Sequence, residues 1–248
     1  MDGVSALTIL DDWYGPRAIE YSRAWELQRD LHARRVADEI GDTALLLEHE
    51  AVFTAGRRTE PHERPHDGSP VIDVDRGGKI TWHGPGQLVA YPIVRLPGHV
   101  LVVDYVRRME EAMIRTMADL GVVTGRVPGR SGVWLAAEPG RPERKIAAIG
   151  IRVSRGVTMH GISINADNDL SVYDQFMACG IPDAGVTSLT AELGRDVTVA
   201  ETATAFTPHL QDLLSWREYT PAPDTTSGTT TGAGAEVSVP VGGLTPRG

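Results

Sequence analysis

Arg76-Gly77-Gly78-Lys79-Ile80-Thr81-Trp82-His83-Gly84-Pro85-Gly86-Gln87 is the densest polar and glycine-rich stretch of this 248-residue chain. Three short runs, Val71–Asp75, Lys79–Trp82 and Gln87–Val94, lie on or beside it and are separated by glycine-containing turns. Short apolar runs bounded by such turns are typical of paired β-strands. The stretch therefore predicts three strands joined as an antiparallel meander.

Helical and strand patterns alternate on both sides of this meander. A first helix is predicted from Pro16 to just before Gly41, because proline favours the first helical position and glycine ends helices. Asp104 is the predicted cap of a second long helix, and Thr198-x-x-Glu201 is a capping box that opens a last helix. Further strands are predicted at Thr43–Glu48, Val133–Ala136, Lys145–Val153 and Val157–Asn165.

Several hairpins with helices at their edges indicate an α+β domain with a mixed, largely antiparallel sheet flanked by helices. Residues 1–220 form this single predicted domain. From Pro221 onward the chain is rich in threonine, glycine, serine and proline and has few apolar side chains. This composition predicts that residues 221–248 are a disordered tail that carries no chemistry.

The overall charge argues against nucleic acid as the main partner, because the formal charge is −9 and the pI is near 5.4. Basic residues still cluster as Arg57-Arg58, as Arg76 with Lys79, and as Arg141 with Arg144-Lys145. Such clusters can dock an acidic partner or belong to an ordinary mixed-charge surface, and the sequence leaves both interpretations open.

The sequence favours a cytoplasmic protein that does not enter the membrane. No stretch approaches the roughly 20 apolar residues of a membrane-spanning helix. Met1–Val4 lacks the basic and apolar regions that open a signal peptide, so none is predicted. The single cysteine, Cys179, excludes an intrachain disulfide and fits a reducing compartment.

Cys179 is the first candidate for catalysis. Most lone cysteines are small buried hydrophobes, but Ser171–Ala178 has the pattern of a short capped helix and Gly180 that of its end. The cysteine would then lie where a helix gives way to a loop, a common place for functional side chains. Because a helix C-terminus disfavours a thiolate, a nucleophilic Cys179 needs a nearby cation or base.

Lys145 is the best candidate for that helper. Strand alternation over residues 145–153 places its side chain on the same face as Ala147 and Ile149. A lysine at the end of an apolar face is partly dehydrated, which favours its neutral form. It could then take a proton from the thiol and return it to a leaving group.

His160 competes with Lys145 for this role. If a three-residue hairpin loop joins the two strands, His160 lies opposite Gly150 and on the other face from Lys145. Both side chains could then flank Cys179 only if a bulge intervened. We therefore prefer Lys145 as the acid and base and assign His160 a supporting or structural role.

The glycine-rich stretch is the predicted ligand-binding segment. Its glycines permit close approach of the backbone and leave amide groups free to face a developing oxyanion, and Trp82 can wall an apolar slot. It lacks the glycine spacing of phosphate-binding and dinucleotide-binding loops. Prolines beside His62 and His66 disfavour a helical metal pair, so neither a metal nor another cofactor is predicted.

Together these segments resemble the octanoyltransferases of lipoate biosynthesis, also called lipoyl(octanoyl) transferases. The resemblance covers roughly residues 5–216 and rests on motifs in the family's order: Glu48–Thr54, Arg76–Val89, Lys145–Gly150, His160-Gly161 and Cys179-Gly180. With Trp82 where tyrosine is common, the chain is similar to actinobacterial members. One departure is Ala178, where the family usually has a proline that rigidifies the loop before the cysteine.

The resemblance implies the fold of the biotin and lipoate protein ligase catalytic domain. It implies that Cys179 is the acyl-thioester nucleophile and that Lys145 activates its thiol. It also implies that the following residues line the acyl pocket: Arg76, Gly77, Gly78, Lys79, Ile80, Thr81, Trp82, His83, Ala148, Ile149, Gly150, Gly161, Ile162 and Ser163.

The same resemblance implies the substrates. The expected donor is octanoyl-acyl carrier protein, and the expected acceptors are apo lipoyl domains of 2-oxoacid dehydrogenases and the glycine-cleavage H protein. Neither ATP nor a metal is expected, because exchange between thioesters is nearly isoenergetic and amide formation is downhill.

Two other functions remain open at this point. An ATP-dependent lipoate or biotin protein ligase on the same fold would make an acyl-adenylate and would not depend on Cys179. A non-catalytic lipoyl-domain-binding protein would form no acyl-enzyme. Transfer from acyl carrier protein without ATP, together with acylation of Cys179, would separate the three functions.

Overall fold

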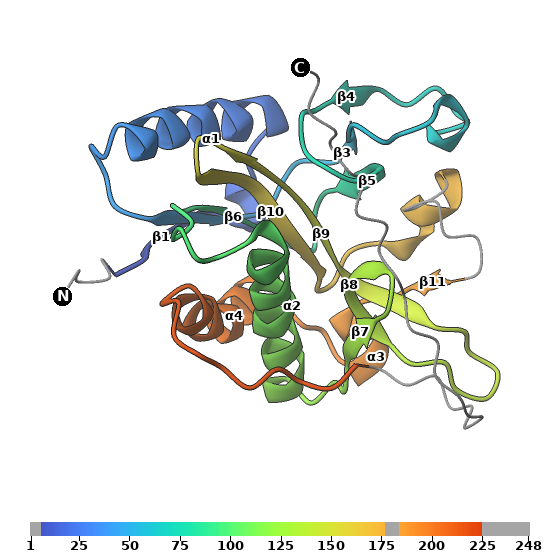
Figure 1. Cartoon of the computed structure of the whole chain (residues 1–248). Coiled ribbons are helices and arrows are strands. Elements are labelled where there is room, and N and C mark those ends of the chain that lie inside the picture. The colour runs from blue at the N-terminus through green and yellow to red at the C-terminus, as the bar shows by residue number, and fades with distance from the viewer. Residues whose placement is uncertain (1–5, 177–183, 225–248) are drawn as a thin grey trace, which may run out of the picture.

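The computed structural model describes residues 6–176 and 184–224. Its large sheet contains β1 (Thr8–Trp13), β2 (Thr43–Leu47), β6 (Gln87–Ile93), β7 (Gly125–Val127), β8 (Arg130–Leu135), β9 (Arg144–Ser154), β10 (Val157–Asn165) and β11 (Gly185–Val186). The strand order is β1-β2-β6-β10-β9-β8-β7, and β11 pairs with β9 outside this path (Figure 1). The β1–β2 and β11–β9 pairs are parallel and the other pairs are antiparallel. The prediction of a mixed, largely antiparallel sheet is confirmed.

A second, smaller sheet has the order β4-β3-β5, from β3 (Val52–Ala55), β4 (Val71–Asp73) and β5 (Ile80–His83). The predicted meander is therefore wrong. The unpredicted strand β3 lies between β4 and β5, parallel to the first and antiparallel to the second, and β6 belongs to the large sheet. Burial of Phe53 of β3 against Ile80 and Trp82 explains why β3 takes this place.

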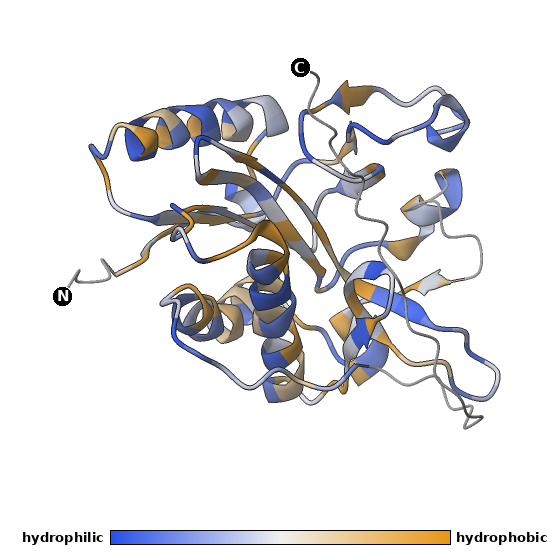
Figure 2. Ribbon diagram, viewed as in Figure 1, coloured by the Kyte–Doolittle hydropathy of each residue, from blue (hydrophilic) through white to orange (hydrophobic). Residues whose placement is uncertain are grey.

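Helices cover both faces of the large sheet (Figure 1). α1 (Tyr21–Val36) packs on one face, and α2 (Val102–Asp119) and α4 (Val199–Leu213) pack on each other and on the opposite face. Figure 2 shows hydrophobic residues, in orange, concentrated in the central strands and on the helix surfaces beside them. Short helices occur at Gly15–Arg17, Pro61–Glu63, Leu170–Gln175 and α3 (Leu189–Leu193).

The first helix begins later than predicted. Pro16 lies in the separate 3-10 turn, and α1 begins at Tyr21. The carboxylate of Glu20 caps it by accepting hydrogen bonds from the N–H groups of Ser22 and Arg23. Glutamate is an uncommon cap, so the sequence pattern favoured the proline instead.

The other two helix starts differ in how well they were predicted. Asp104 is not the cap of α2, because α2 begins at Val102 and Asp104 accepts the N–H of Leu101 from within the first turn. Thr198 caps α4 as predicted, and its hydroxyl accepts the N–H of Glu201 at 3.1 Å.

The β9–β10 hairpin has a register one residue away from the predicted one. Ser154 pairs with Val157, so the turn has two residues, Arg155 and Gly156, both with positive φ. This is the backbone that two-residue hairpin turns require. His160 consequently pairs with Ile151, and Gly150 pairs with Gly161.

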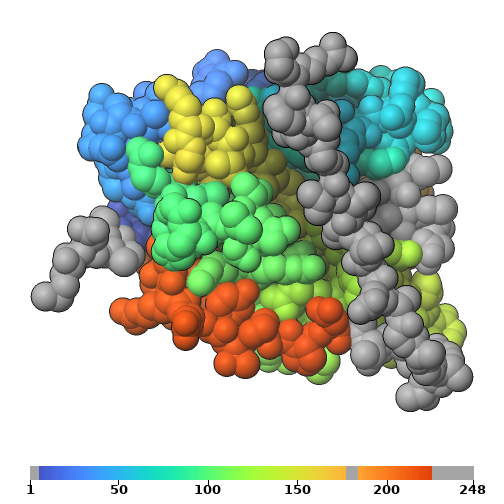
Figure 3. Space-filling view, viewed as in Figure 1, coloured from blue at the N-terminus to red at the C-terminus, as the bar shows by residue number. Residues whose placement is uncertain are grey.

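The domain continues beyond residue 220. Ala222 donates its N–H to Glu111 of α2 at 2.9 Å, and its carbonyl accepts a hydrogen bond from Arg126 at 2.9 Å. Figure 3 shows the C-terminal part of the described chain, in orange, next to the green surface to which α2 belongs. Residues 221–224, which we assigned to the tail, therefore contact the folded domain.

None of the helices in the described part of the chain combines the length and the apolar composition of a membrane span.

Candidate active site

A cavity of about 280 Å³ lies between the glycine-rich stretch and strands β9 and β10. Its lining consists of Tyr21, Arg58, Arg76, Gly78, Lys79, Ile80, Thr81, His83, Tyr91, Gly129, Arg130, Ser131, Lys145, Ala148, Ile149, Gly150, His160, Gly161, Ile162 and Ser163. The structure thus gathers Lys145, His160 and nearly all the predicted pocket residues around one space. Gly77 and Trp82 are the predicted pocket residues that do not line it.

A β-bulge brings Lys145 to this cavity. Val133 pairs with Ala147 but Trp134 pairs with Lys145, so Ile146 is an extra residue on β9. Ile146 and Ala147 are both buried in the core cluster, which breaks the alternation of side chains at this point. The prediction that Lys145 shares a face with Ala147 is therefore wrong, because the bulge turns Lys145 to the cavity side.

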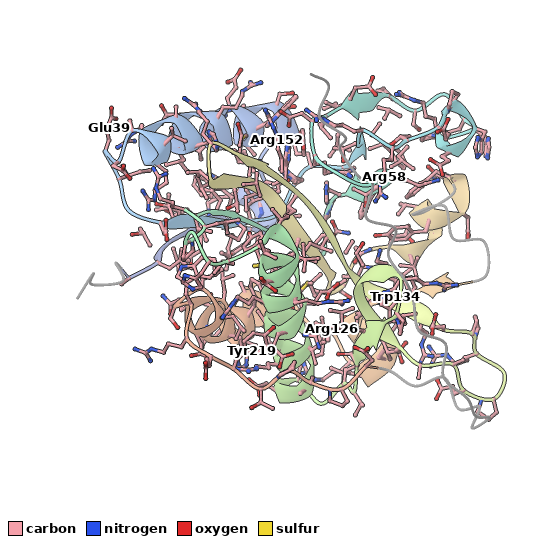
Figure 4. All side chains as sticks on the ribbon, viewed as in Figure 1. Glu39, Arg58, Arg126, Trp134, Arg152 and Tyr219 are labelled. Atoms are coloured by element: carbon pink, nitrogen blue, oxygen red, sulfur yellow. The ribbon has the colours of Figure 1, made fainter. Side chains whose placement is uncertain are left out.

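The stem of Lys145 lies across β8. Its Nζ atom is 5.1 Å from the ring centre of Trp134, which Figure 4 labels on that strand. Gly132 leaves the space for the stem: a Cβ atom there would lie 2.6 Å from Cε of Lys145 and 2.4 Å from the carbonyl oxygen of Ala147. The position of the amine is thus fixed by an aromatic face and by the absence of a side chain.

Arg76 shapes the glycine-rich stretch from inside. Its buried guanidinium donates hydrogen bonds to the carbonyl oxygens of Gly77, Lys79 and Thr54 at 2.8–3.0 Å. The N–H of Gly77 donates to the carbonyl oxygen of Ile151 at 2.9 Å, which attaches the stretch to β9. Arg76 and Gly77 therefore hold the wall in place.

Two further predicted pocket residues have partners that do not line the cavity. Lys79 forms an ion pair with the fully buried carboxylate of Glu63. Trp82 packs in the small cluster with Phe53 and Phe176. The apolar slot expected beside Trp82 is thus part of the packing of the small sheet.

His160 has a left-handed backbone, with φ of 57°, inside a buried strand. Its N–H donates to Oε1 of Gln28 on α1, and its Nε2 donates to Oδ1 of Asp75 at 2.7 Å. Such a conformation is costly for a residue with a side chain. Together with the changed register, it places the histidine ring on the cavity lining that Lys145 also reaches, where we had predicted opposite faces.

The pKa values of the cavity histidines favour their neutral forms. Burial lowers the pKa of His83 to about 3, and burial also lowers that of His160, although the carboxylate of Asp75 opposes this shift. His83 donates from Nδ1 to Gln87 at 2.7 Å. Both shifts favour the uncharged ring, so neither histidine is expected to act as a cationic partner for a thiolate.

Several lining residues were not predicted from the sequence. Tyr21 and Tyr91 come from α1 and β6, and residues 129–131 come from the β7–β8 turn and the start of β8. The hydroxyl of Tyr91 donates to His49 at 2.8 Å, and burial lowers the pKa of His49 to about 4. These residues lie far apart in the sequence and follow no motif. Arg58 also lines the cavity, and its sequence signal was only the charge of the Arg57-Arg58 pair.

Cys179 lies outside the described residues, as do Ala178 and Gly180. The residues before and after this segment belong to the described part of the chain. Before it, Phe176 packs edge-on against Phe53 with ring centres 5.2 Å apart. After it, Val186 pairs with Lys145, and Thr187 donates its N–H to the carbonyl oxygen of Lys145 at 2.9 Å.

The basic clusters differ in whether their side chains form ion pairs within the fold or are exposed at the cavity. Arg141 and Arg144 form ion pairs with Glu138 and Glu192, so they stabilise the fold and do not form a free docking patch. Arg58, by contrast, is exposed and lines the cavity.

In residues 6–176 and 184–224 we find no group of three or more histidine, cysteine, aspartate or glutamate side chains placed to hold a metal ion.

The comparisons with known proteins point to one family. Residues 20–211 match the lipoyl protein ligase A/B catalytic domain. The octanoyltransferase of Salinispora tropica is 63% identical over 194 residues, which are 78% of this chain and 91% of that protein. The octanoyltransferase of Thermobifida fusca is 58% identical over 219 residues, which are 87% of this chain and 93% of that protein.

Among solved structures, the fold is similar to that of the archaeal lipoylation system of Thermoplasma acidophilum, described as a bi-partite lipoate protein ligase and its E2 lipoyl domain. The TM-score is 0.56 at 14% identity, over 85% of this chain and 83% of that chain. This likeness confirms the predicted fold, and the sequence relatives define the branch. The chain belongs to the lipoyl protein ligase A/B catalytic domain family and, within it, to the octanoyltransferases.

Proposed function

We propose that this chain transfers an octanoyl group from octanoyl-acyl carrier protein to a lysine of apo lipoyl domains, through a thioester on Cys179. The observation that carries the proposal is the placement of Lys145. A bulge turns its amine into the cavity, and the chain that follows the Cys179 segment pairs with Lys145 itself. The residue that pairs with Lys145 follows Cys179, the one cysteine of the sequence, after only a few positions.

In the first half-reaction, the Cys179 sulfur attacks the carbonyl carbon of the octanoyl thioester. A C–S bond forms to Cys179 and the C–S bond to the carrier's phosphopantetheine breaks. Lys145 takes the thiol proton and gives it to the departing phosphopantetheine thiolate, so the proton count balances. The donor is already an activated thioester, so the step uses no ATP.

In the second half-reaction, the neutral amine of the acceptor lysine attacks the acyl-enzyme. The amide C–N bond forms, the bond to Cys179 breaks, and Lys145 passes the proton lost by nitrogen to the cysteine sulfur. Covalent catalysis thus divides one transfer into two accessible barriers.

The proposed acceptors are lipoyl domains of 2-oxoacid dehydrogenases and the glycine-cleavage H protein. Exposed Arg58 at the cavity is a contact for acidic partner surfaces, which would favour their encounter despite the negative charge of the chain as a whole. We place the reaction in the cytoplasm, where a lone reactive thiol stays reduced.

Intact-mass measurement after incubation with octanoyl-acyl carrier protein, without ATP, tests the proposal. We expect an octanoyl adduct on the wild-type chain and none on Cys179→Ser, and at least a ten-fold slower appearance of the adduct with Lys145→Ala. An adduct that persists in Cys179→Ser would place the acyl group on an atom other than the Cys179 sulfur and would overturn the proposed thioester. Transfer that requires ATP and ignores Cys179 would show a ligase mechanism instead. If Lys145→Ala were acylated at the wild-type rate at neutral pH, Lys145 would not be the acid and base of the reaction.

A further inference from the structure

The cavity has two chemically different ends. Along β9 its lining runs from Lys145 to Gly150, and along the paired strand β10 it runs from Ser163 to His160. The five steps from Lys145 to Gly150, at about 3.3 Å each in a β-strand, span roughly 16 Å. Lys145 marks one end of this span, and four aromatic rings gather toward the other.

These rings, Tyr21, His83, Tyr91 and His160, are called the end wall below. The rings of Tyr21 and His83 are stacked with centres 6.3 Å apart, and those of Tyr91 and His160 meet edge-on at 6.5 Å. His49 connects the two pairs behind the wall, with ring centres 5.0 Å from Tyr21 and 5.8 Å from Tyr91. The wall is therefore one continuous aromatic layer.

Hydrogen bonds keep the His160 ring from moving aside. Asp75 accepts from its Nε2 at 2.7 Å, and Gln28 accepts from its backbone N–H at 2.9 Å. The ring also packs beside Trp25, with centres 6.3 Å apart, and the side chain is only 1% exposed. The left-handed backbone of His160 is thus fixed from three directions, and cavity lining on β10 stops at this residue.

We infer that His160 ends the acyl cavity and limits the length of the acyl chain that Cys179 can carry, an inference that rests on the function proposed above. An octanoyl chain has seven carbon–carbon bonds of about 1.5 Å, so its contour is roughly 10 Å. With the thioester near Lys145, a chain of this length reaches along residues 148–150 and stops before the end wall. A dodecanoyl chain must displace the His160 ring.

The test is a competition between donors. The full chain is incubated with equal amounts of acyl carrier protein that carries octanoyl, decanoyl or dodecanoyl groups, and the adducts on the intact enzyme are quantified by mass. His160→Gly removes the ring without backbone strain, because glycine adopts positive φ readily. We expect its dodecanoyl-to-octanoyl adduct ratio to rise about ten-fold over wild type, the effect of burying roughly two more methylenes of the longer chain where the ring had stood.

His160→Asn is a second variant, because asparagine tolerates a left-handed backbone and is shorter than histidine. It should shift the ratio in the same direction by a smaller factor. His32→Ala is the matched control: His32 is also a buried histidine with one hydrogen bond, to the carbonyl oxygen of Ser154, and does not line the cavity. Its adduct ratio should equal that of the wild type.

The outcomes separate this inference from the proposed function. Wild-type adduct ratios in both His160 variants would overturn the role of His160 and leave the acyl-enzyme mechanism intact. Failure of the wild-type chain to form any adduct would overturn the proposed function itself.

Discussion

Two residues of β8 decide where the amine of Lys145 lies. Trp134 offers a ring face to Nζ, an attraction worth about 0.5–2 kcal/mol between a cation and an aromatic ring. Gly132 has φ of 106° and donates its N–H to the buried carboxylate of Glu110 at 3.0 Å, so the backbone is held close to the lysine stem. The reactive group is therefore placed by residues that do not themselves react.

Gly132→Ala should slow acylation of the enzyme by at least ten-fold. The new Cβ atom would lie 2.6 Å from Cε of Lys145, so the lysine or the strand must shift. Gly140→Ala is the matched control, because Gly140 also has positive φ but a Cβ atom there meets nothing within 4 Å. Equal acylation rates for the two variants, measured by intact mass over time, would show that only backbone strain matters.

Arg58→Gln should reduce kcat/KM for the carrier-protein donor several-fold at low salt, and the difference should shrink as salt screens the charge. The reason is its position: Arg58 is exposed and lines the cavity. Its neighbour Arg57 is also exposed but does not line the cavity, so Arg57→Gln controls for net charge. If both variants lose activity equally, a general attraction and no local contact is responsible.

The sequence identified Lys145 but not the way it reaches the cavity. Alternation alone put it beside Ala147, since a bulge depends on a tertiary contact between β8 and β9 and leaves no local pattern. His160 was also seen, but its left-handed backbone depends on Gln28 of a distant helix. Tyr21 and Tyr91 escaped notice because only the folded chain brings them together.

Among the elements, β11 connects the Cys179 segment to the large sheet. It is two residues long, and the next residue, Thr187, donates its hydroxyl to Glu192 of α3 at 2.5 Å. Glu192 in turn accepts hydrogen bonds from Arg144 and Arg141. A short strand next to the site thus depends on a carboxylate and two guanidinium groups for its stability.

Glu192→Gln should lower the free energy of unfolding by roughly 1–3 kcal/mol at pH 7, because buried Arg144 loses a charged partner. The hydrogen bond from Arg144 is the main reason why the pKa of Glu192 falls from 4.5 to about 2. A lowered pKa stabilises the folded state above the unfolded pKa, so this contribution is lost as pH falls from about 4.5 toward 2.

Urea titrations at several pH values measure this effect. The wild type should lose stability over that pH window more steeply than Glu192→Gln does. Glu201→Gln removes a carboxylate from an exposed pair with Arg195 and should change little. Parallel pH curves for the wild type and Glu192→Gln would contradict the assignment.

Strand positions were easier to predict than strand partners. The runs around β6, β9 and β10 had the expected bounds within about two residues, because their turns carry glycine. The partner of β5 could not be predicted, since β3 approaches it from another part of the chain. The hairpin register failed by one residue because the sequence does not distinguish a two-residue from a three-residue turn there.

For the whole molecule, the fold class followed from the order of elements, and the family followed from spaced motifs. The end of the domain could not be predicted in this way, because the composition changes at Pro221 while contacts with the folded domain continue. Composition measures how much apolar surface a segment can bury, and residues 221–224 are held by backbone hydrogen bonds to charged side chains instead.

The last four described residues should therefore matter for stability. The carboxylate of Glu111 accepts the N–H of Ala222, and the guanidinium of Arg126 donates to the Ala222 carbonyl. The side chains of Glu111 and Arg126 are only 3% and 4% exposed, so water replaces these bonds poorly. A variant truncated after Thr220 should have a free energy of unfolding about 1–3 kcal/mol lower than a variant truncated after Asp224. Equal urea midpoints for the two variants would mean that Glu111 and Arg126 need no hydrogen bonds beyond their own ion pair. The domain would then end where its composition changes.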